Sequence, residues 1–167
     1  MDMVNSYKKI AIIGPPGSGK STFAAKLGKK TQIPVHHLDR HMFEESGKKK
    51  DKQEFIEMQK AMLSAESWVV EGCSFSTWEM RFIQADLILY FDFNRVLCIW
   101  RLCKRFFIYR KEFGGLRAIT WEILQYVWTF HKEKKTRLQQ LRRRYPGKEL
   151  RIFINQKEVD RFLEQCI

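Results

Sequence analysis

Short apolar runs alternate along the chain with segments in which apolar residues recur at helical spacing. The runs are typical of buried parallel strands and lie at residues 10–13, 33–38, 68–72, 85–92 and 150–154. The first run is followed by a predicted helix over residues 21–30, in which Phe23, Ala24 and Leu27 share one face. The alternation predicts an α/β fold with a five-stranded parallel sheet, and the long run at 85–92 is expected near its middle.

Polar residues in front of the helical segments predict where several helices begin. Residues 51–54 and 76–79 each match a capping box, in which a side chain at the start of a helix bonds a backbone N–H three residues on. Asn94 and Asn155 are suited to cap the helices that follow them. We therefore expect four helices to start at these positions.

Two helical segments carry apolar stripes rich in aromatic residues. In the segment that follows Asn94, the stripe consists of Val96, Trp100, Cys103 and Phe107. In the segment 119–144, the stripe consists of Trp121, Leu124, Trp128, Leu138 and Leu141. We expect both stripes to pack in the core. The second segment is also compatible with nucleic-acid binding by stacking and charge, because its aromatic residues are interleaved with Lys132, Lys134, Lys135 and Arg137.

Composition narrows the class of protein. The 167 residues suit a single domain over residues 1–167, and no apolar run approaches the roughly 20 residues that span a bilayer. The start of the chain lacks the pattern of a signal peptide, so we expect a cytoplasmic protein without a membrane partner, either a monomer or a weak homodimer. The four cysteines form no C-x-x-C pair, which favours reduced thiols over a disulfide or a zinc site.

Basic residues outnumber acidic ones, 31 to 19, for a formal net charge of +12. Such an excess favours polyanions as partners, whether nucleotides, nucleic acid or a membrane surface, and charge alone does not choose among them. The excess gathers in residues 95–117 and 132–148. A local anion site is therefore more plausible than a uniformly basic coat.

A phosphate-binding loop follows the first strand directly. The segment reads Gly14, Pro15, Pro16, Gly17, Ser18, Gly19, Lys20, Ser21 and Thr22, which matches G-x-x-x-x-G-K-S between a strand and a helix. Its glycines let backbone N–H groups approach an anion, and the helix that begins near Lys20 adds its positive end. Lys20 is expected at the β- and γ-phosphates of ATP and the Ser21 hydroxyl at Mg²⁺. Nucleotide binding is the firmest prediction.

Charged residues stand at the ends of the second and third strands, at the edge where open α/β sheets bind ligands. Asp39 is a candidate to orient or deprotonate an acceptor hydroxyl, and Arg40 to hold an anionic group of the acceptor. Glu71 stands where an acid would hold Mg²⁺ through its water shell or orient the acceptor, and Gly72 allows a close approach of substrate. The alternatives are a helix cap or surface carboxylate for Asp39, a solvated side chain for Arg40 and an ordinary strand-end glutamate for Glu71.

Two further residues are weaker candidates on the acceptor side. His37 could line the acceptor pocket; a metal site with His41 is less favoured, because no third ligand is spaced to join them. Arg81 lies off the helical face of Trp78 and Phe82, and is either an acceptor contact or a surface arginine. The segment of about 40–66 is expected to form a flap over the acceptor.

A basic lid is predicted at about residues 106–118, with a Gly114-Gly115 hinge. Arginines of a lid would neutralise the moving phosphoryl group as the site closes and expels water. The candidates are Arg101, Arg105, Arg110 and Arg117. The alternative is a solvated basic face. In such sheets the loop at Asn155 and Gln156 lies near enough to the phosphate loop to flank the adenine.

Taken in order, the motifs GPPGSGKST, IPVHHLD, WVVEGCSFST, ADLILYFDF and INQKEV resemble those of the adenylate-kinase-like P-loop kinases, and among them the FlaR-like family of DNA topology modulation proteins. The resemblance runs nearly end to end. It implies the three-layer P-loop NTPase fold with strand order 2-3-1-4-5, ATP and Mg²⁺ on the loop, and a cleft between flap and lid. Nucleoside monophosphate kinases usually carry D-G-F-P-R after the third strand, whereas residues 71–75 read E-G-C-S-F. That departure puts a nucleoside monophosphate acceptor in doubt.

We expect an ATP-dependent kinase that transfers the γ-phosphoryl group to a small acceptor, whether a nucleotide, a nucleoside or another metabolite. The alternative is a nucleotide-regulated nucleic-acid-binding protein that affects DNA topology and has little or no kinase activity. Its charge allows this second function, and the lack of a recognised nucleic-acid motif argues against it.

Overall fold

The computed structural model describes residues 6–42, 50–112 and 121–166. Its five-stranded parallel sheet consists of β1 (Lys9–Ile13), β2 (Val35–His37), β3 (Trp68–Glu71), β4 (Leu87–Phe91) and β5 (Glu149–Phe153). The strand order is β2-β3-β1-β4-β5, so the predicted fold and strand order are confirmed. The carboxyl ends of all five strands meet at one edge of the sheet.

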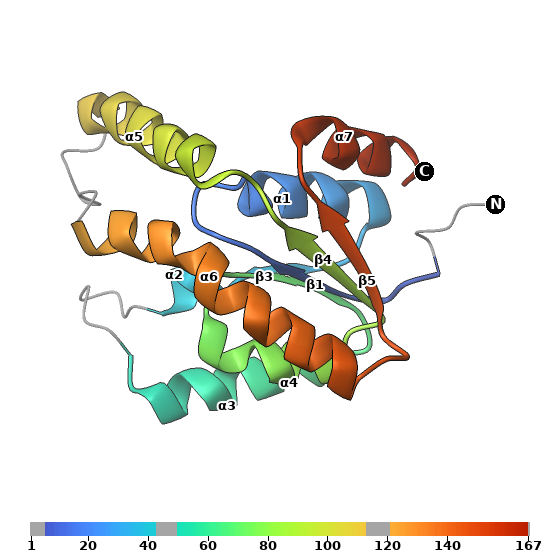
Figure 1. Ribbon diagram of the computed structural model, residues 1–167. Helices are drawn as coiled ribbons and strands as arrows, with labels where there is room; N and C mark the ends of the chain where they lie inside the picture. The colour runs from blue at the N-terminus through green and yellow to red at the C-terminus, as the bar shows by residue number, and fades with distance from the viewer. Residues whose placement is uncertain (1–5, 43–49, 113–120, 167) are drawn as a thin grey trace.

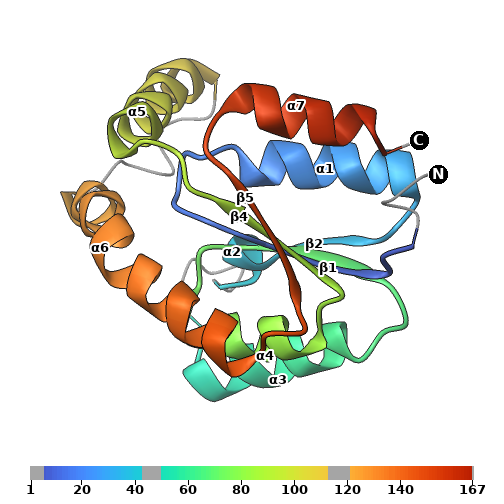
Figure 2. The ribbon, with the colours of Figure 1, turned by 45° about the vertical axis from the view of Figure 1, so that its right-hand side comes forward.

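Helices cover both faces of the sheet and make three layers (Figures 1 and 2). One face is covered by α1 (Lys20–Thr31), α5 (Arg95–Glu112) and α7 (Gln156–Glu164). The other is covered by α3 (Lys52–Leu63), α4 (Trp78–Gln84) and α6 (Trp121–Arg144). A short helix, α2 (Leu38–His41), follows β2 directly, and a 3₁₀ turn at Phe75–Thr77 precedes α4.

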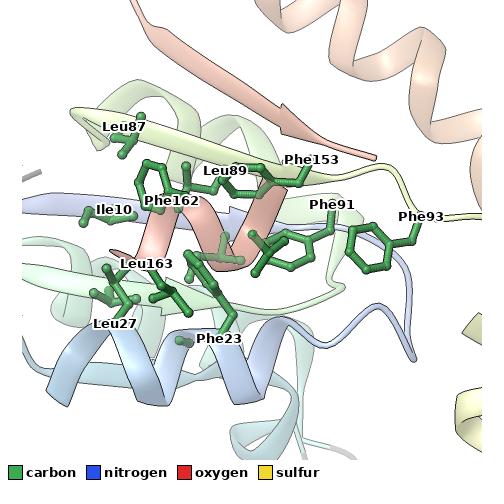
Figure 3. Close-up of a cluster of buried hydrophobic side chains, with 14 of the residues drawn as sticks. Ile10, Phe23, Leu27, Leu87, Leu89, Phe91, Phe93, Phe153, Phe162 and Leu163 are labelled. Carbon is green, nitrogen blue, oxygen red and sulfur yellow. The ribbon is translucent and has the colours of Figure 1, made fainter. Parts of the chain in front are cut away.

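Strand side chains alternate between two apolar cores, one on each face of the sheet. Ile10 and Ile12 of β1 point into the core under α1 and α7, while Ala11 and Ile13 point into the core under α3, α4 and α6. Figure 3 shows the first core, in which the ring of Phe23 meets that of Phe91 edge to face, with 5.3 Å between the centroids. Burial on both faces explains why the strands read as continuous apolar runs.

Several predicted boundaries need correction. The second strand is shorter than the predicted residues 33–38, because the chain turns into α2 after His37 and places Asp39 in that helix. The predicted capping box at residues 76–79 is wrong: α4 begins at Trp78, and the side chain of Thr77 makes no cap bond. The caps at Asp51, Asn94 and Asn155 are confirmed, since each side chain accepts a backbone N–H of the helix that follows.

The prediction that the aromatic stripes lie in the core is wrong for much of α5 and α6. Trp100, Trp121 and Trp128 are 56%, 77% and 51% exposed. The buried face of α5 carries Cys98 and Leu102 instead, and Val96 and Phe107 are exposed with Trp100. The buried face of α6 is made by Val127, Phe130, Leu138 and Leu141, so the prediction holds for the two leucines. In the part of the chain that the structure describes, no helix combines the length and apolar character of a membrane span.

Candidate functional site

The loop between β1 and α1 takes a shape that only glycines allow. Gly14, Gly17 and Gly19 have φ angles of 152°, 79° and 95°, in the region that side chains disfavour. A Cβ atom on Gly17 would lie 2.3 Å from the carbonyl oxygen of Cys98 at the start of α5. A Cβ on Gly14 would lie 2.8 Å from the Cβ of Phe91. The loop therefore packs closely against β4 and α5. It leads directly into the N-terminus of α1, where backbone N–H groups can bind an anion.

Lys20 lies folded back onto this loop. Its Nζ donates to the carbonyl oxygen of Pro15 at 2.8 Å and to Sγ of Cys73 at 3.2 Å. The same carbonyl accepts the hydroxyl of Ser18 at 2.8 Å. The lysine is only 4% exposed, yet it lines a cavity that is open to solvent. A flexible ammonium group at the floor of a cavity can turn toward an anion without a change in the backbone.

Ser21, Glu71 and His37 meet at the carboxyl end of β3. Oε1 of Glu71 accepts the hydroxyl of Ser21 at 2.8 Å and lies 2.7 Å from Nδ1 of His37. Glu71 is 1% exposed, and within the described residues its other oxygen, Oε2, has no hydrogen-bond partner. A buried carboxylate oxygen without a partner is costly unless a ligand completes it. A hydroxyl and a carboxylate are donors that Mg²⁺ prefers, so these residues fit the metal that a phosphate loop implies.

The segment Gly72–Ser74 after β3 is tied down by three other elements. Asp39 accepts the backbone N–H of Cys73 at 3.1 Å, and the hydroxyl of Tyr126, on α6, donates to the carbonyl of Cys73 at 3.1 Å. A Cβ on Gly72 would lie 2.9 Å from the Cβ of Leu38, so this glycine lets α2 approach the strand end. The side chain of Cys73 faces the cavity beside Asp39.

Arg81, on α4, binds the backbone of the segment Gly72–Ser74. Its side chain is fully buried, and its two terminal nitrogens donate to the carbonyls of Gly72 at 3.1 Å and Ser74 at 2.6 Å. The expectation that it lies off the buried face of α4 is therefore wrong. Burial lowers the pKa of Arg81 to about 10, which leaves it charged at neutral pH. The guanidinium fixes the backbone of this segment through these two bonds. A contact between Arg81 and the acceptor stays a prediction.

Burial also sets the state of the cysteine beside Lys20. It raises the pKa of the Cys73 thiol to about 12, against the opposing pull of the Lys20 charge. The thiol is therefore neutral at physiological pH, and its sulfur accepts a hydrogen bond from the Lys20 ammonium group. The contact with Lys20 therefore does not make Cys73 a thiolate nucleophile.

A cavity of about 360 Å³ connects the predicted donor and acceptor sides. Its floor is formed by the phosphate loop and the first turns of α1, and Asp39 and Cys73 stand at one wall. Arg101 and Arg105 of α5 and Gln156 of α7 stand at another. Arg101 donates to the carbonyl of Ser18 at 3.2 Å and to Oε1 of Gln156 at 3.3 Å, so it joins loop and helix at the cavity.

The remaining predicted site residues are placed less directly. Arg40 is exposed on α2, and Asn155 uses its side chain to cap α7. Arg117 and the predicted hinge lie outside the described residues, as does the side chain of Arg110 on α5. The roles of Arg40, Asn155, Arg110 and Arg117 remain predictions.

Two residues of the site were missed from the sequence. Cys73 follows Glu71 and Gly72, which were considered for magnesium and substrate, and no sequence motif marked the cysteine itself. Tyr126 lies in α6 far along the chain, and only the tertiary fold brings its hydroxyl to the carbonyl of Cys73. The contact between His37 and Glu71 could have been suspected once β2 was placed beside β3, because the two residues are register partners.

Replacing Gly17 by alanine should weaken nucleotide binding strongly. The new methyl group would meet the backbone of α5 at 2.3 Å and force the loop out of shape. We expect a loss of ATP affinity of at least about tenfold, measured by calorimetry, because loop amides must converge on the phosphates. Gly147→Ala is the matched control, since nothing lies within 4 Å of its Cβ position. Equal affinity in the two variants would contradict the assignment of the loop.

No protein-family profile matches the chain, and no curated protein matches it. Solved structures do match. A shikimate kinase from Acinetobacter baumannii in complex with shikimate superposes with a TM-score of 0.64 at 15% identity, over 98% of this chain and 92% of its own. A shikimate kinase from Bacteroides thetaiotaomicron gives 0.59 at 15% identity, over 95% of both chains. A gluconokinase from Sinorhizobium meliloti 1021 gives 0.54 at 14% identity, over 95% of this chain and 89% of its own.

These similarities concern the fold, because the identities are low. They do not single out the topology modulation family that the motifs resemble. The sheet order, the phosphate loop and the superposed structures agree with one another. The chain therefore has the fold of the P-loop kinases.

Proposed function

We propose that the protein is an ATP-dependent kinase that transfers the γ-phosphoryl group of ATP to a small-molecule acceptor. The observation that carries this proposal is the convergence of three features on one cavity: the phosphate loop with Lys20, the hydroxyl of Ser21 with Glu71 bonded behind it, and Asp39. Phosphoryl transfer is catalysed mainly by positioning and charge neutralisation, and these residues supply both. The kinases with the same fold add support.

On the donor side, the loop amides and the N-terminus of α1 bind the phosphates, and Lys20 leaves Pro15 and Cys73 to reach the β- and γ-phosphates. Ser21 and Glu71 would hold the magnesium, which would supply positive charge to neutralise the phosphates. Arg101 and Arg105, which line the cavity, would neutralise the transferred phosphoryl group. Gln156, at the start of α7, flanks the adenine.

On the acceptor side, Asp39 orients the attacking hydroxyl and accepts its proton. Its carboxylate already holds the N–H of Cys73, which fixes its direction at the cavity wall. Arg40, exposed on α2 directly after β2, would hold an anionic group of the acceptor. The acceptor is a hydroxyl compound of metabolite size; the cavity of about 360 Å³ must also hold part of the donor.

The test is a screen of nucleosides, nucleotides and sugars for acceptor-dependent release of ADP with purified protein. We expect at least one class to raise ADP release well above the rate with water alone, and phosphorylated product to accumulate in equal amount. Tight ATP binding together with no acceptor-dependent turnover across all classes would count against a kinase.

A second candidate function is nucleotide-regulated binding of nucleic acid, and one observation favours it. The exposed tryptophans of α5 and α6 stand beside cations: the guanidinium of Arg95 lies 3.9 Å from the ring centre of Trp128, and Nζ of Lys104 lies 5.2 Å from that of Trp100. Exposed rings with adjacent cations suit stacking on single strands. Affinity for single-stranded DNA that falls steeply with salt and is unaffected by Lys20→Ala would support this function. Salt-independent or absent binding would remove it.

A further inference from the structure

Glu71 receives both of its hydrogen bonds on the same oxygen. The hydroxyl of Ser21 and Nδ1 of His37 contact Oε1 at 2.8 and 2.7 Å, while Oε2 is buried without a partner in the described chain. The two donors come from different elements, α1 and β2. The carboxylate is therefore fixed in one orientation, with one oxygen used and the other left over.

The register of the sheet brings His37 and Glu71 together at the ends of two neighbouring strands. His37 and Glu71 are direct partners across β2 and β3, each at the last position of its strand. An ionised carboxylate oxygen only accepts, so the proton of the contact resides on Nδ1, and the imidazole is held in that tautomer. The ring keeps most of its surface covered, with 18% of its side chain exposed.

We propose that His37 is a positioning residue for magnesium. It holds Glu71 so that Oε2 serves the Mg²⁺ ion, or its water shell, that accompanies the nucleotide. His37 itself touches neither the metal nor the substrate. This inference rests on the proposed function and assigns to His37 a role different from the acceptor contact expected from the sequence. Partners that orient a metal ligand are worth roughly 10–100-fold in metal affinity.

The effect should appear in the gain that magnesium gives to nucleotide binding. The probe is a non-hydrolysable ATP analogue, whose Kd is measured by calorimetry in EDTA and again at saturating Mg²⁺. We expect His37→Leu to reduce the magnesium-dependent gain by about tenfold or more, with the Kd in EDTA changed less than twofold. A role confined to the stability of β2 would not move this ratio.

Two conservative variants sharpen the test. The side-chain amide of His37→Asn places a donor where Nδ1 stands and should restore most of the gain, whereas His37→Gln places it one bond further out and should not. His36→Asn is the matched control, because neighbouring strand residues point to opposite faces. Should His37→Leu fail to fold by circular dichroism, the difference between Asn and Gln decides.

The outcomes separate this inference from the kinase proposal. A wild-type protein that binds the analogue with a magnesium gain, and His37 variants that all keep it, would overturn the role of His37 alone. Equal losses with and without magnesium would also overturn it, because they indicate a general structural defect. A wild-type protein that does not bind the analogue at all would defeat both proposals.

Discussion

Replacing Lys20 by alanine is expected to lower ATP turnover on the order of 100-fold or more. The lysine supplies a mobile positive charge at the floor of the cavity, and charge stabilisation of a moving phosphoryl group is the largest single contribution to such catalysis. Its removal should not unfold the protein, because its bonds to Pro15 and Cys73 are made by one flexible side chain. Turnover with the acceptor found in the screen, and ATP affinity by calorimetry, give the measurement.

Lys26→Ala is the control for this variant. Lys26 lines the same cavity from further along α1, so the variant removes the same charge from the same helix. We expect a loss of less than about fivefold, since a solvated charge at this distance is screened. Unchanged turnover in Lys20→Ala would sink the kinase proposal, and an equal loss in both variants would show that net charge, rather than position, matters.

Replacing Arg81 by methionine should produce the largest loss of stability. Its guanidinium is fully buried and bonds the carbonyls of Gly72 and Ser74, which the variant would leave without that partner. Hydrogen bonds to a charged group are worth about 1.5–3 kcal/mol each, so we expect a loss of about 3 kcal/mol in the free energy of unfolding after relaxation. In a domain of this size that corresponds to a fall in Tm of about 6–12 °C.

Denaturant unfolding and calorimetry measure this change, with Arg137→Met as the control. Arg137 is likewise bonded, to the carboxylate of Glu79 at 2.7 Å instead of to backbone carbonyls, but its side chain is 32% exposed. Partly exposed ion pairs are worth about 1 kcal/mol or less, so the control should lose little. Arg81→Lys keeps the charge without the fork and should fall between the two. A change below about 0.5 kcal/mol in Arg81→Met would contradict its role at the strand end.

The fold could be predicted because its strongest signals are local. β1, β3 and β4 each contain at least three consecutive apolar residues, and the phosphate loop links strand to helix within a few residues. The stripes on α5 could not be resolved in this way. That helix has two apolar faces, and the one with Cys98 and Leu102 is buried while the aromatic one is exposed. Periodicity shows that faces exist, and only the path of the chain decides which one meets the sheet.

In the candidate site, too, the residues marked by local sequence signals were predicted and those placed by tertiary packing were not. Lys20, Ser21 and Glu71 were predicted from strand ends and motif spacing, and the bond between Ser21 and Glu71 joins two of them. The partners of the segment Gly72–Ser74 were not predicted, because α2, α4 and α6 reach it only through tertiary packing. Arg81 illustrates the reason: a charged side chain in an amphipathic helix is expected at the surface, and its burial depends on two distant carbonyls.

The anchoring of Gly72–Ser74 has a consequence for redesign of the protein. Each of its three carbonyls already accepts a side-chain donor, so the backbone here is a fixed frame. Within this segment Cys73 lines the cavity, so its side chain is the one to exchange when discrimination among acceptors is to be changed here. A small library at Cys73, with Arg81 and Tyr126 kept, would alter the shape of the wall without loosening it. Selectivity and foldability would thus be adjustable separately.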